Sequence, residues 1–516
     1  MLEVYDCTLR EGEQAEGVHF SIEDRINITL ALNEFDMDFI EVGWPIHEEV
    51  LETLLKLNKE KLKSKIVAFG STSFTKNPEE DKNLNSILKS KVKYACIFGK
   101  TWAEHVEKQL KISKKENLKK IFDSVKFLRD RNIKVFYDAE HYFDGFKHNS
   151  EYAFKTIEKA AEAGASKIIL CDTNGGTLTE ETAEIIEKTK QFIKEKGLKV
   201  ELGAHIHNDS GLAFANSLEA LKHVNHIQGT INGLGERVGN VDLCELIPFL
   251  MLKKKMQLNF RLDKLKRLSD LVYKAANLPR KIDQAFISSR AFSHKGGVHI
   301  DATSKGASYS HVMPESLGLQ HSFALTSLGG KAGVMSAAKK FGFSVKKGER
   351  KITEVLGCLR DLERKGYSLG SIEAEQFMII GKYFGNFRNL LKIDDWSINT
   401  NKHKSKCYLE LDIDGEKIKA EGEVNGGPVE AIYKTIINAL PKKYDNKKNL
   451  KLKDYSVRIV NPKGAASSVR TKISFSGNEE FSTVGVSENI IQSSLEAIEK
   501  AFNYYLYKSR FIKQNQ

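Results

Sequence analysis

The stretch Gly203-Ala204-His205-Ile206-His207-Asn208-Asp209 combines the apolar pattern of a strand with two histidines two residues apart. Side chains alternate along a strand, so both imidazoles would lie on one face. A strand end that carries two imidazoles and then turns polar is a good place to hold a divalent metal. Two structural histidines would give the same pattern, so the motif by itself leaves both interpretations open.

Around this stretch, short β-rich runs alternate with amphipathic helical runs from residue 2 to about residue 250. The predicted strands are Glu3–Thr8, Phe39–Gly43, Lys65–Gly70, Tyr94–Gly99, Lys134–Glu140, Lys167–Thr173, Glu201–His207 and His226–Asn232. The predicted helices include Ser21–Phe35, Glu116–Arg131, Glu151–Ala163, Glu180–Glu195 and Leu212–His223. Eight strand–helix units predict an α/β fold of the (β/α)8 TIM-barrel type. A doubly wound sheet is the alternative, but no glycine-rich dinucleotide motif follows the first strand.

The rest of the chain predicts two further regions. The pattern is mostly helical up to about residue 395 and then becomes strand-like. The elements predicted in this last part are strands at Cys407–Ile413, Glu416–Gly422, Tyr455–Val460 and Val469–Phe475, and helices at Pro428–Leu440 and Ser487–Lys508. We therefore expect a TIM-barrel catalytic domain at 1–258, a helical linker region at 259–395 and an α+β regulatory domain at 396–516.

Composition narrows the class of protein. The net charge is +12, but the lysines are interleaved with acidic residues and form no basic stripe with aromatics, so we expect a solvated surface and no nucleic-acid partner. No run of 18 apolar residues is present, which predicts no membrane span. Six cysteines are scattered singly, and the chain opens directly in strand pattern, so we expect a cytoplasmic protein.

Polar residues follow nearly every predicted strand at the end where barrel enzymes keep their active sites. They are Arg10, Glu11, Glu13, Gln14, Trp44, Lys100, Trp102, Glu140, His141, Asp172, Thr173, Asn174, His205, His207, Glu236, Arg237 and Asn240. Glu11 with His205 and His207 supplies one carboxylate and two imidazoles, a set that suits Mg, Mn, Zn or Co. Arg10 is placed either to neutralise a developing oxyanion or to form an ion pair with Glu11 or Glu13.

Several stretches carry a resemblance to a known family. Asp6–Gln14 (DCTLREGEQ), His205–Asp209 (HIHND) and Gly233–Asn240 (GLGERVGN) resemble the metal-dependent acyltransferases that condense acetyl-CoA with 2-oxo acids. This is the family of the 2-isopropylmalate, homocitrate and citramalate synthases. Asn425–Val429 (NGGPV) and Thr483–Ile491 (TVGVSENII) look like its allosteric domain, which binds the end-product amino acid. The stretches that look like the citramalate branch are Ala68–Thr72, Phe98–Trp102, Phe136–Gly145 and Cys171–Gly176.

The resemblance implies a role for each matched residue. The implied metal ligands are Glu11, His205, His207 and Asn240. Arg10 would bind the keto oxygen and Thr173 the substrate carboxylate, with Gln14 also in the substrate site. The implied catalytic residues besides Arg10 are Glu140, His299, Tyr309 and Asp301, and which of them is the base stays open. In this family the segment after the barrel reaches into the partner subunit's site, which implies a domain-swapped homodimer.

The implied reaction is a Claisen-type condensation with acetyl-CoA as co-substrate, followed by thioester hydrolysis. Pyruvate is the expected acceptor, giving (R)-citramalate for isoleucine biosynthesis, and 2-oxoisovalerate, giving 2-isopropylmalate for leucine biosynthesis, is the alternative. The expected feedback inhibitor is the corresponding amino acid. A C–C lyase on the same barrel is disfavoured by the amino-acid-sensing domain. A nucleic-acid or regulatory binding protein is disfavoured because Glu11, His205 and His207 are all present.

Overall fold

The chain divides into two compact units, each with its own core. The structure is a computed structural model that describes residues 2–288, 290–294, 310–323, 325–346, 348–370, 372–442, 444, 449–461, 467–477 and 479–514. One unit is Met1–Ala291 with Val312–Gln320, and the other is Phe292–His311 with His321–Gln516. The domain boundaries predicted after residues 258 and 395 stay a prediction.

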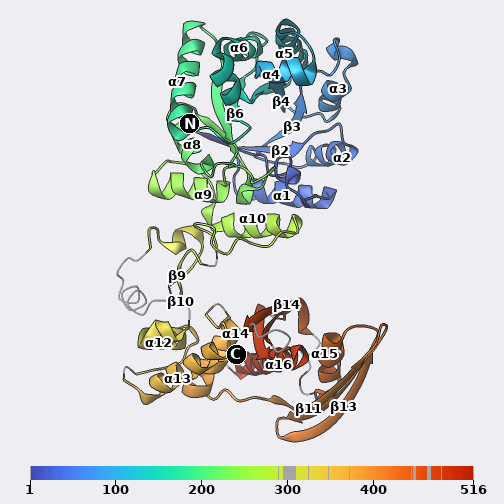
Figure 1. Cartoon of the computed structure of the whole chain (residues 1–516), viewed down its shortest axis with the longest axis vertical. Coiled ribbons are helices and arrows are strands. Elements are labelled where there is room, and N and C mark those ends of the chain that lie inside the picture. Colours follow the sequence, from blue (N-terminus) through green and yellow to red (C-terminus); the bar gives the residue numbers. More distant parts are fainter. Residues whose placement is uncertain are drawn as a thin grey trace. The chain divides into compact units, whose positions relative to one another are not determined.

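The first unit is built on a closed barrel of eight parallel strands, β1 to β8 in chain order (Figure 1, blue to green). The strands are β1 (Glu3–Asp6), β2 (Phe39–Gly43), β3 (Lys65–Ser71), β4 (Tyr94–Lys100), β5 (Lys134–Glu140), β6 (Lys167–Asp172), β7 (Glu201–Ile206) and β8 (His226–Gly229). The barrel closes where β8 pairs with β1, with Glu3 opposite His226. The predicted TIM barrel is therefore confirmed.

Helices cover the outside of this barrel, as the alternating sequence pattern predicts. They are α1 (Ile22–Glu34), α2 (Glu48–Leu57), α3 (Lys82–Lys89), α4 (Ala103–His105), α5 (Lys114–Arg129), α6 (Tyr142–Glu162), α7 (Thr179–Glu195), α8 (Ala213–Ala220) and α9 (Leu243–Pro248). A further helix, α10 (Leu262–Ala275), packs on α1 and α9. Ser21 and Ser113 start α1 and α5 by capping boxes with Asp24 and Glu116. Helix α6 begins nine residues before the predicted Glu151, because its first part joins the rest across a kink at Asn149.

Large side chains fill the interior of the barrel near the amino ends of its strands. Tyr5, Phe39, Phe136 and His226 are all buried, and their rings lie 5.2–6.2 Å apart between centroids. The barrel is consequently a packed core rather than a pore at this end.

The second unit contains two antiparallel three-stranded sheets (Figure 1, orange to red). The strands of the first sheet are, in order, β11 (Leu391–Thr400), β12 (Ser405–Ile413) and β13 (Glu416–Val424). Those of the second sheet are β14 (Lys451–Asn461), β15 (Ser468–Ser476) and β16 (Glu480–Ser487). Helices α15 (Pro428–Ala439) and α16 (Ile490–Gln514) pack against the sheets. The predicted α+β domain is confirmed, with β11 and β16 as two strands beyond the prediction.

Among the described residues, the helices α12 (Gly330–Lys340), α13 (Arg350–Arg364) and α14 (Glu373–Phe384) precede the sheets in this unit. Phe377 and Met378 of α14 belong to the same buried core as Leu409 of β12 and Phe502 of α16. Helix α14 is therefore packed into the C-terminal sheets.

Short two-residue strands, β9 (Ser293–His294) and β10 (Ser322–Phe323), pair in parallel earlier in this unit. Among all the described residues, no helix is long and apolar enough to cross a membrane.

Candidate active site and metal centre

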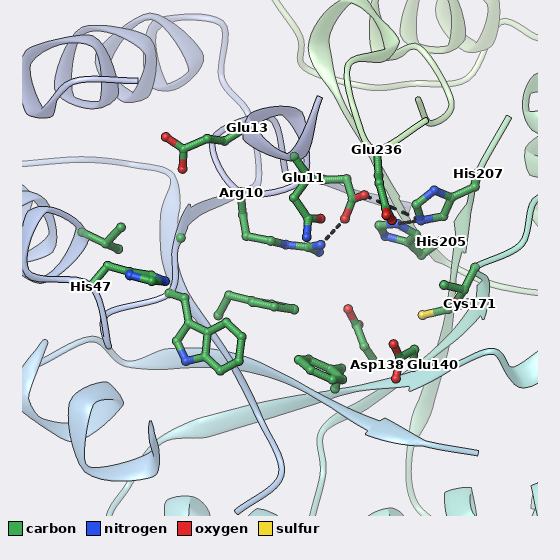
Figure 2. A pocket seen from close by; sticks show the side chains of 17 residues that line it. Arg10, Glu11, Glu13, His47, Asp138, Glu140, Cys171, His205, His207 and Glu236 are labelled. Carbon is green, nitrogen blue, oxygen red and sulfur yellow. Dashed lines mark hydrogen bonds and ion pairs between the residues drawn. The ribbon is translucent and has the colours of Figure 1, made fainter. Parts of the chain in front are cut away.

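A cavity of about 310 Å³ opens at the carboxyl ends of the barrel strands (Figure 2). Its lining residues come from the ends of most strands and from the loops that follow them. They are Arg10, Glu11, Glu13, Gln14, Gly43, Trp44, His47, Val50, Phe69, Phe98, Asp138, Glu140, Cys171, Thr173, His205, His207 and Glu236. This is the end of the barrel at which the sequence predicts the site.

Glu11, His205 and His207 form a group that could hold a metal ion. One ligand atom from each lies within 4.8 Å of those of the other two, and all three residues are buried. The two Nε2 atoms are 3.3 Å apart, and Nε2 of His207 lies 3.8 Å from a Glu11 carboxylate oxygen. Figure 2 shows the three side chains together on one side of the cavity. One carboxylate and two imidazoles leave further positions of a divalent ion open to a substrate.

The electrostatics of this group also suit a metal, because a metal binds neutral imidazole and ionised carboxylate. Burial lowers the pKa of His205, and burial together with the neighbouring His205 lowers the pKa of His207 to about 3. Burial alone would raise the pKa of Glu11, but the Arg10 guanidinium and the two imidazoles together bring it below its usual value. All three shifts favour the forms that bind a metal, neutral imidazole and ionised carboxylate.

Asn240 lies beside the same group. Its Nδ2 is 2.8 Å from Nε2 of His205, and its buried Oδ1 has no hydrogen-bond partner in the part of the chain that the structure describes. The two ends of an amide are interchangeable by rotation, so the unpartnered oxygen can be turned to face His205. An amide oxygen of this kind fits as a fourth ligand of a divalent ion.

Arg10 reaches the cavity from the turn after β1 and is held on two sides. Its Nε donates to Oε1 of Glu41 at 2.6 Å, and its Nη1 pairs with Glu11. The Tyr5 hydroxyl donates to the other oxygen of Glu41 at 2.5 Å. The ring of Phe69 lies 4.0 Å from the guanidinium carbon. Arg10 thus forms the ion pair with Glu11 that the sequence allows, while its guanidinium lines the cavity as well.

Acidic residues stand across the cavity from Glu11. Asp138 and Glu140 project from β5 and lie below Glu11 and the two histidines in the view of Figure 2. Nζ of Lys100 lies 2.7 Å from a Glu140 oxygen. The Thr173 hydroxyl accepts a hydrogen bond from the backbone N–H of His141 at 2.9 Å, so its own proton is left to donate.

The structure thus brings most of the predicted site residues together. Arg10, Glu11, Gln14, Glu140, Thr173, His205 and His207 line one cavity, and Asn240 contacts His205. His299, Asp301 and Tyr309 lie outside the described residues. Sequence reasoning did not single out Glu41, Asp138 and Gln228, which are buried polar residues within the strands β2, β5 and β8. A charged or amide side chain inside such a strand is the signal that could have found them.

Three family descriptions match consecutive parts of the chain. Residues 1–272 match the HMGL-like family, and residues 286–366 match the homocitrate synthase post-HMGL domain-like family. Residues 372–506 match the LeuA allosteric (dimerisation) domain. The order of the three matches agrees with a barrel, a linker region and a C-terminal domain.

Curated relatives match over nearly the whole chain. The (R)-citramalate synthase of Geobacter sulfurreducens is 39% identical, covering 99% of this chain and 99% of its own. The (R)-citramalate synthase of Sulfolobus acidocaldarius is 38% identical, and the match covers 99% of this chain and 98% of that protein. The 2-isopropylmalate synthase of Methanocaldococcus jannaschii is more distant, 28% identical with 98% and 95% covered. The chain therefore belongs to the HMGL-like family of barrel enzymes, in the branch of the (R)-citramalate synthases.

Proposed function

We propose that this enzyme condenses acetyl-CoA with pyruvate and hydrolyses the thioester to give (R)-citramalate and CoA, in isoleucine biosynthesis. The observation that carries the proposal is the buried group of Glu11, His205 and His207 beside Arg10 in one cavity. The full-length likeness to (R)-citramalate synthases supports pyruvate as the acceptor. The alternative is 2-isopropylmalate synthesis from 2-oxoisovalerate, since the more distant relatives are named 2-isopropylmalate synthases.

Glu11, His205, His207 and Asn240 would hold a divalent cation, Mg, Mn, Zn or Co. When bound, such an ion polarises the carbonyl of a chelating 2-oxo acid as a Lewis acid. Arg10 donates to the oxygen that gains negative charge as the new C–C bond forms. The Thr173 hydroxyl binds the substrate carboxylate, and Gln14 borders the same site.

A base must remove a proton from the methyl group of acetyl-CoA. Glu140 is the candidate within the described residues, because it faces the cavity and is held by Lys100. His299, Tyr309 and Asp301 are the other candidates, supplied by the partner subunit in a domain-swapped homodimer. The match to the LeuA allosteric (dimerisation) domain supports both a dimer and feedback control. The proposed location is cytoplasmic.

The end-product amino acid would bind the C-terminal unit, with isoleucine as the proposed inhibitor. That unit holds a cavity of about 470 Å³ that offers a carboxylate, two ammonium groups and apolar side chains. Its lining residues are Gly427, Val429, Glu430, Tyr433, Lys434, Lys451, Leu452 and Tyr455. Inhibition by leucine in place of isoleucine would favour the alternative function.

The direct test is CoA release from acetyl-CoA with pyruvate, 2-oxobutyrate, 2-oxoisovalerate or 2-oxoglutarate. Enzyme stripped with a chelator would be assayed with and without added Mn²⁺. We expect metal-dependent release with the highest kcat/KM on pyruvate. A preference for 2-oxoisovalerate would support 2-isopropylmalate synthesis, and no metal-dependent release with any acceptor would refute both.

Two glutamates of the same cavity provide a matched pair of variants. Glu11→Gln removes a charge from the proposed metal group, whereas Glu13→Gln changes a glutamate that pairs with Arg25. We expect Glu11→Gln to need far more Mn²⁺ for half-maximal activity and Glu13→Gln to need the same amount as the wild type. Equal metal requirements for the two variants would contradict the assigned ligand.

A further inference from the structure

A line of hydrogen bonds crosses the barrel interior beneath the proposed metal group. Nδ1 of His205 lies 2.7 Å from Oε1 of Gln228, on the neighbouring strand β8. Nε2 of Gln228 donates to Oδ1 of Asp138 on β5 at 3.2 Å. The thiol of Cys96 on β4 donates to the same Asp138 oxygen at 3.0 Å. Gln228 and Cys96 are fully buried, and His205 and Asp138 are nearly so.

The donors and acceptors in this line have one consistent direction. Oδ1 of Asp138 accepts a hydrogen bond from the Cys96 thiol, so the part of Gln228 that faces the same oxygen is the NH₂ end of its amide. The carbonyl end of Gln228 then faces His205, and a carbonyl oxygen only accepts. Nδ1 of His205 must therefore carry the proton. In a neutral imidazole this leaves the lone pair on Nε2, the atom that lies 3.3 Å from His207.

We propose that Gln228 is a positioning residue that fixes the tautomer and ring orientation of His205 for metal binding, and that Asp138 holds the Gln228 amide in the required orientation. The inference rests on the proposed metal site. Among the described residues, Nδ1 of His207 faces no carbonyl of the barrel interior and lies instead 3.1 Å from the guanidinium of Arg237, a side chain that is 36% exposed. His205 is therefore the proposed ligand whose orientation is fixed by side chains of the barrel interior.

Metal affinity separates this role from a purely structural one. Apo-enzyme would be titrated with Mn²⁺, and the free ion followed by its electron paramagnetic resonance signal, without substrate. Gln228→Leu removes the acceptor for Nδ1, and we expect its Kd for Mn²⁺ to rise by about 10- to 100-fold. Gln228→Glu keeps an oxygen facing His205, and a proton shared with Asp138 replaces the lost amide donor, so we expect it to retain nearly the wild-type Kd. If Gln228→Leu does not fold, the comparison of Gln228→Glu with Asp138→Asn remains.

Asp138→Asn tests the second step. An asparagine can donate as well as accept, so the Gln228 amide is free to turn its NH₂ end toward His205 and favour the wrong tautomer. We expect a Kd between those of the wild type and Gln228→Leu. If Asp138 acts through Gln228, the double variant with Gln228→Leu should bind Mn²⁺ no more weakly than Gln228→Leu alone.

The barrel unit offers a matched control in Gln284. This glutamine is also buried, and its Nε2 also donates to a carboxylate, that of Asp242, at 2.6 Å. We expect Gln284→Leu to leave the Kd for Mn²⁺ unchanged. Wild-type affinity in Gln228→Leu, or an equal loss in Gln228→Glu, would overturn the proposal. Unchanged Mn²⁺ binding in His205→Ala would instead show that the metal site itself is wrong.

Discussion

Arg10 and Glu41 form an ion pair inside the barrel, with Nε of Arg10 2.6 Å from Oε1 of Glu41. The two residues come from different strand units, and Glu41 is completely buried in the middle of β2. Tyr5 donates to the second Glu41 oxygen, so Glu41 is itself held in place. The burial of Glu41 means that Arg10 has a structural as well as a chemical role, since each charge compensates the other.

Substituting Arg10 should therefore have two separable effects. Arg10→Ala removes the cation beside the developing oxyanion, and we expect kcat to fall at least about 100- to 1,000-fold. It also leaves Glu41 buried without its partner, which should destabilise the barrel by about 3–5 kcal/mol. The double variant Arg10→Gln with Glu41→Gln removes both charges and should regain most of that stability while staying inactive. Calorimetry and the CoA-release assay give the two readouts. Retained activity in either variant would contradict the role of Arg10.

Gly239 controls the position of Asn240. Its φ is +94°, and a Cβ there would lie 1.9 Å from the carbonyl oxygen of Gly233. Gly239→Ala should push this loop, with Asn240, away from His205 and weaken Mn²⁺ binding. Gly211→Ala is the control, because Gly211 also has a positive φ (+74°) but open space around its Cβ position. Both alanines carry the left-handed backbone penalty of roughly 1–2 kcal/mol. Equal Mn²⁺ affinity in the two variants would argue against Asn240 as a ligand.

Lys500 ties helix α16 to the edge of the second C-terminal sheet. Its Nζ donates to the Val484 carbonyl at 2.8 Å and lies 2.8 Å from Glu496 and 3.4 Å from the buried Glu375. Lys500→Met should destabilise this unit by about 3–5 kcal/mol, because Glu375 would remain buried without a cation. Lys434→Met, which breaks an exposed pair with Glu430, should have almost no effect. Calorimetry would measure the unfolding temperature of each variant. Similar decreases in the two variants would show that the buried ion pair contributes no more to stability than the exposed one.

Asp6 makes the stability of the barrel depend on pH. Burial, opposed in part by hydrogen bonds from Thr8, raises the pKa of Asp6 to about 7. The folded state holds this proton more tightly than the unfolded chain, whose pKa is about 3.9. The stabilising contribution is therefore complete below about pH 4 and is lost as the pH rises through about 7. The unfolding temperature of the wild type, measured relative to that of Asp6→Asn, should fall between pH 4.5 and 7.5. A constant difference across this range would mean that Asp6 has an ordinary pKa.

Several features of the fold could be predicted from local sequence because local physics decides them. All eight barrel strands were located within a few residues, since a fully buried strand must be an apolar run of limited length. β1 ends at Asp6 instead of Thr8 because the chain turns there, with the N–H of Glu11 bonded to the carbonyl of Cys7. The candidate ligands Glu11, His205 and His207 could be named because strand ends of one polarity meet at one rim of a barrel.

Other elements escaped prediction because distant residues complete them. In β16 the edge N–H groups of Val484 and Val486 donate to the carboxylates of Glu375 and Glu496, which lie on helices. In β11 the pairing register shifts between Ile393 and Asp395, which breaks the alternation that marks a strand. Neither the side-chain partners of β16 nor the register shift of β11 can be predicted from a short stretch of sequence.

The sequence by itself determined the barrel, the C-terminal α+β unit and the ring of polar strand ends, because hydrophobic period and turn chemistry are properties of neighbouring residues. Only the tertiary structure decided which interior side chains support that ring. Glu41 reaches Arg10, and Asp138 reaches His205 through Gln228, from strands far apart in the chain. Such contacts depend on the register in which the barrel closes, and a one-residue shift would turn each of these side chains to the outside.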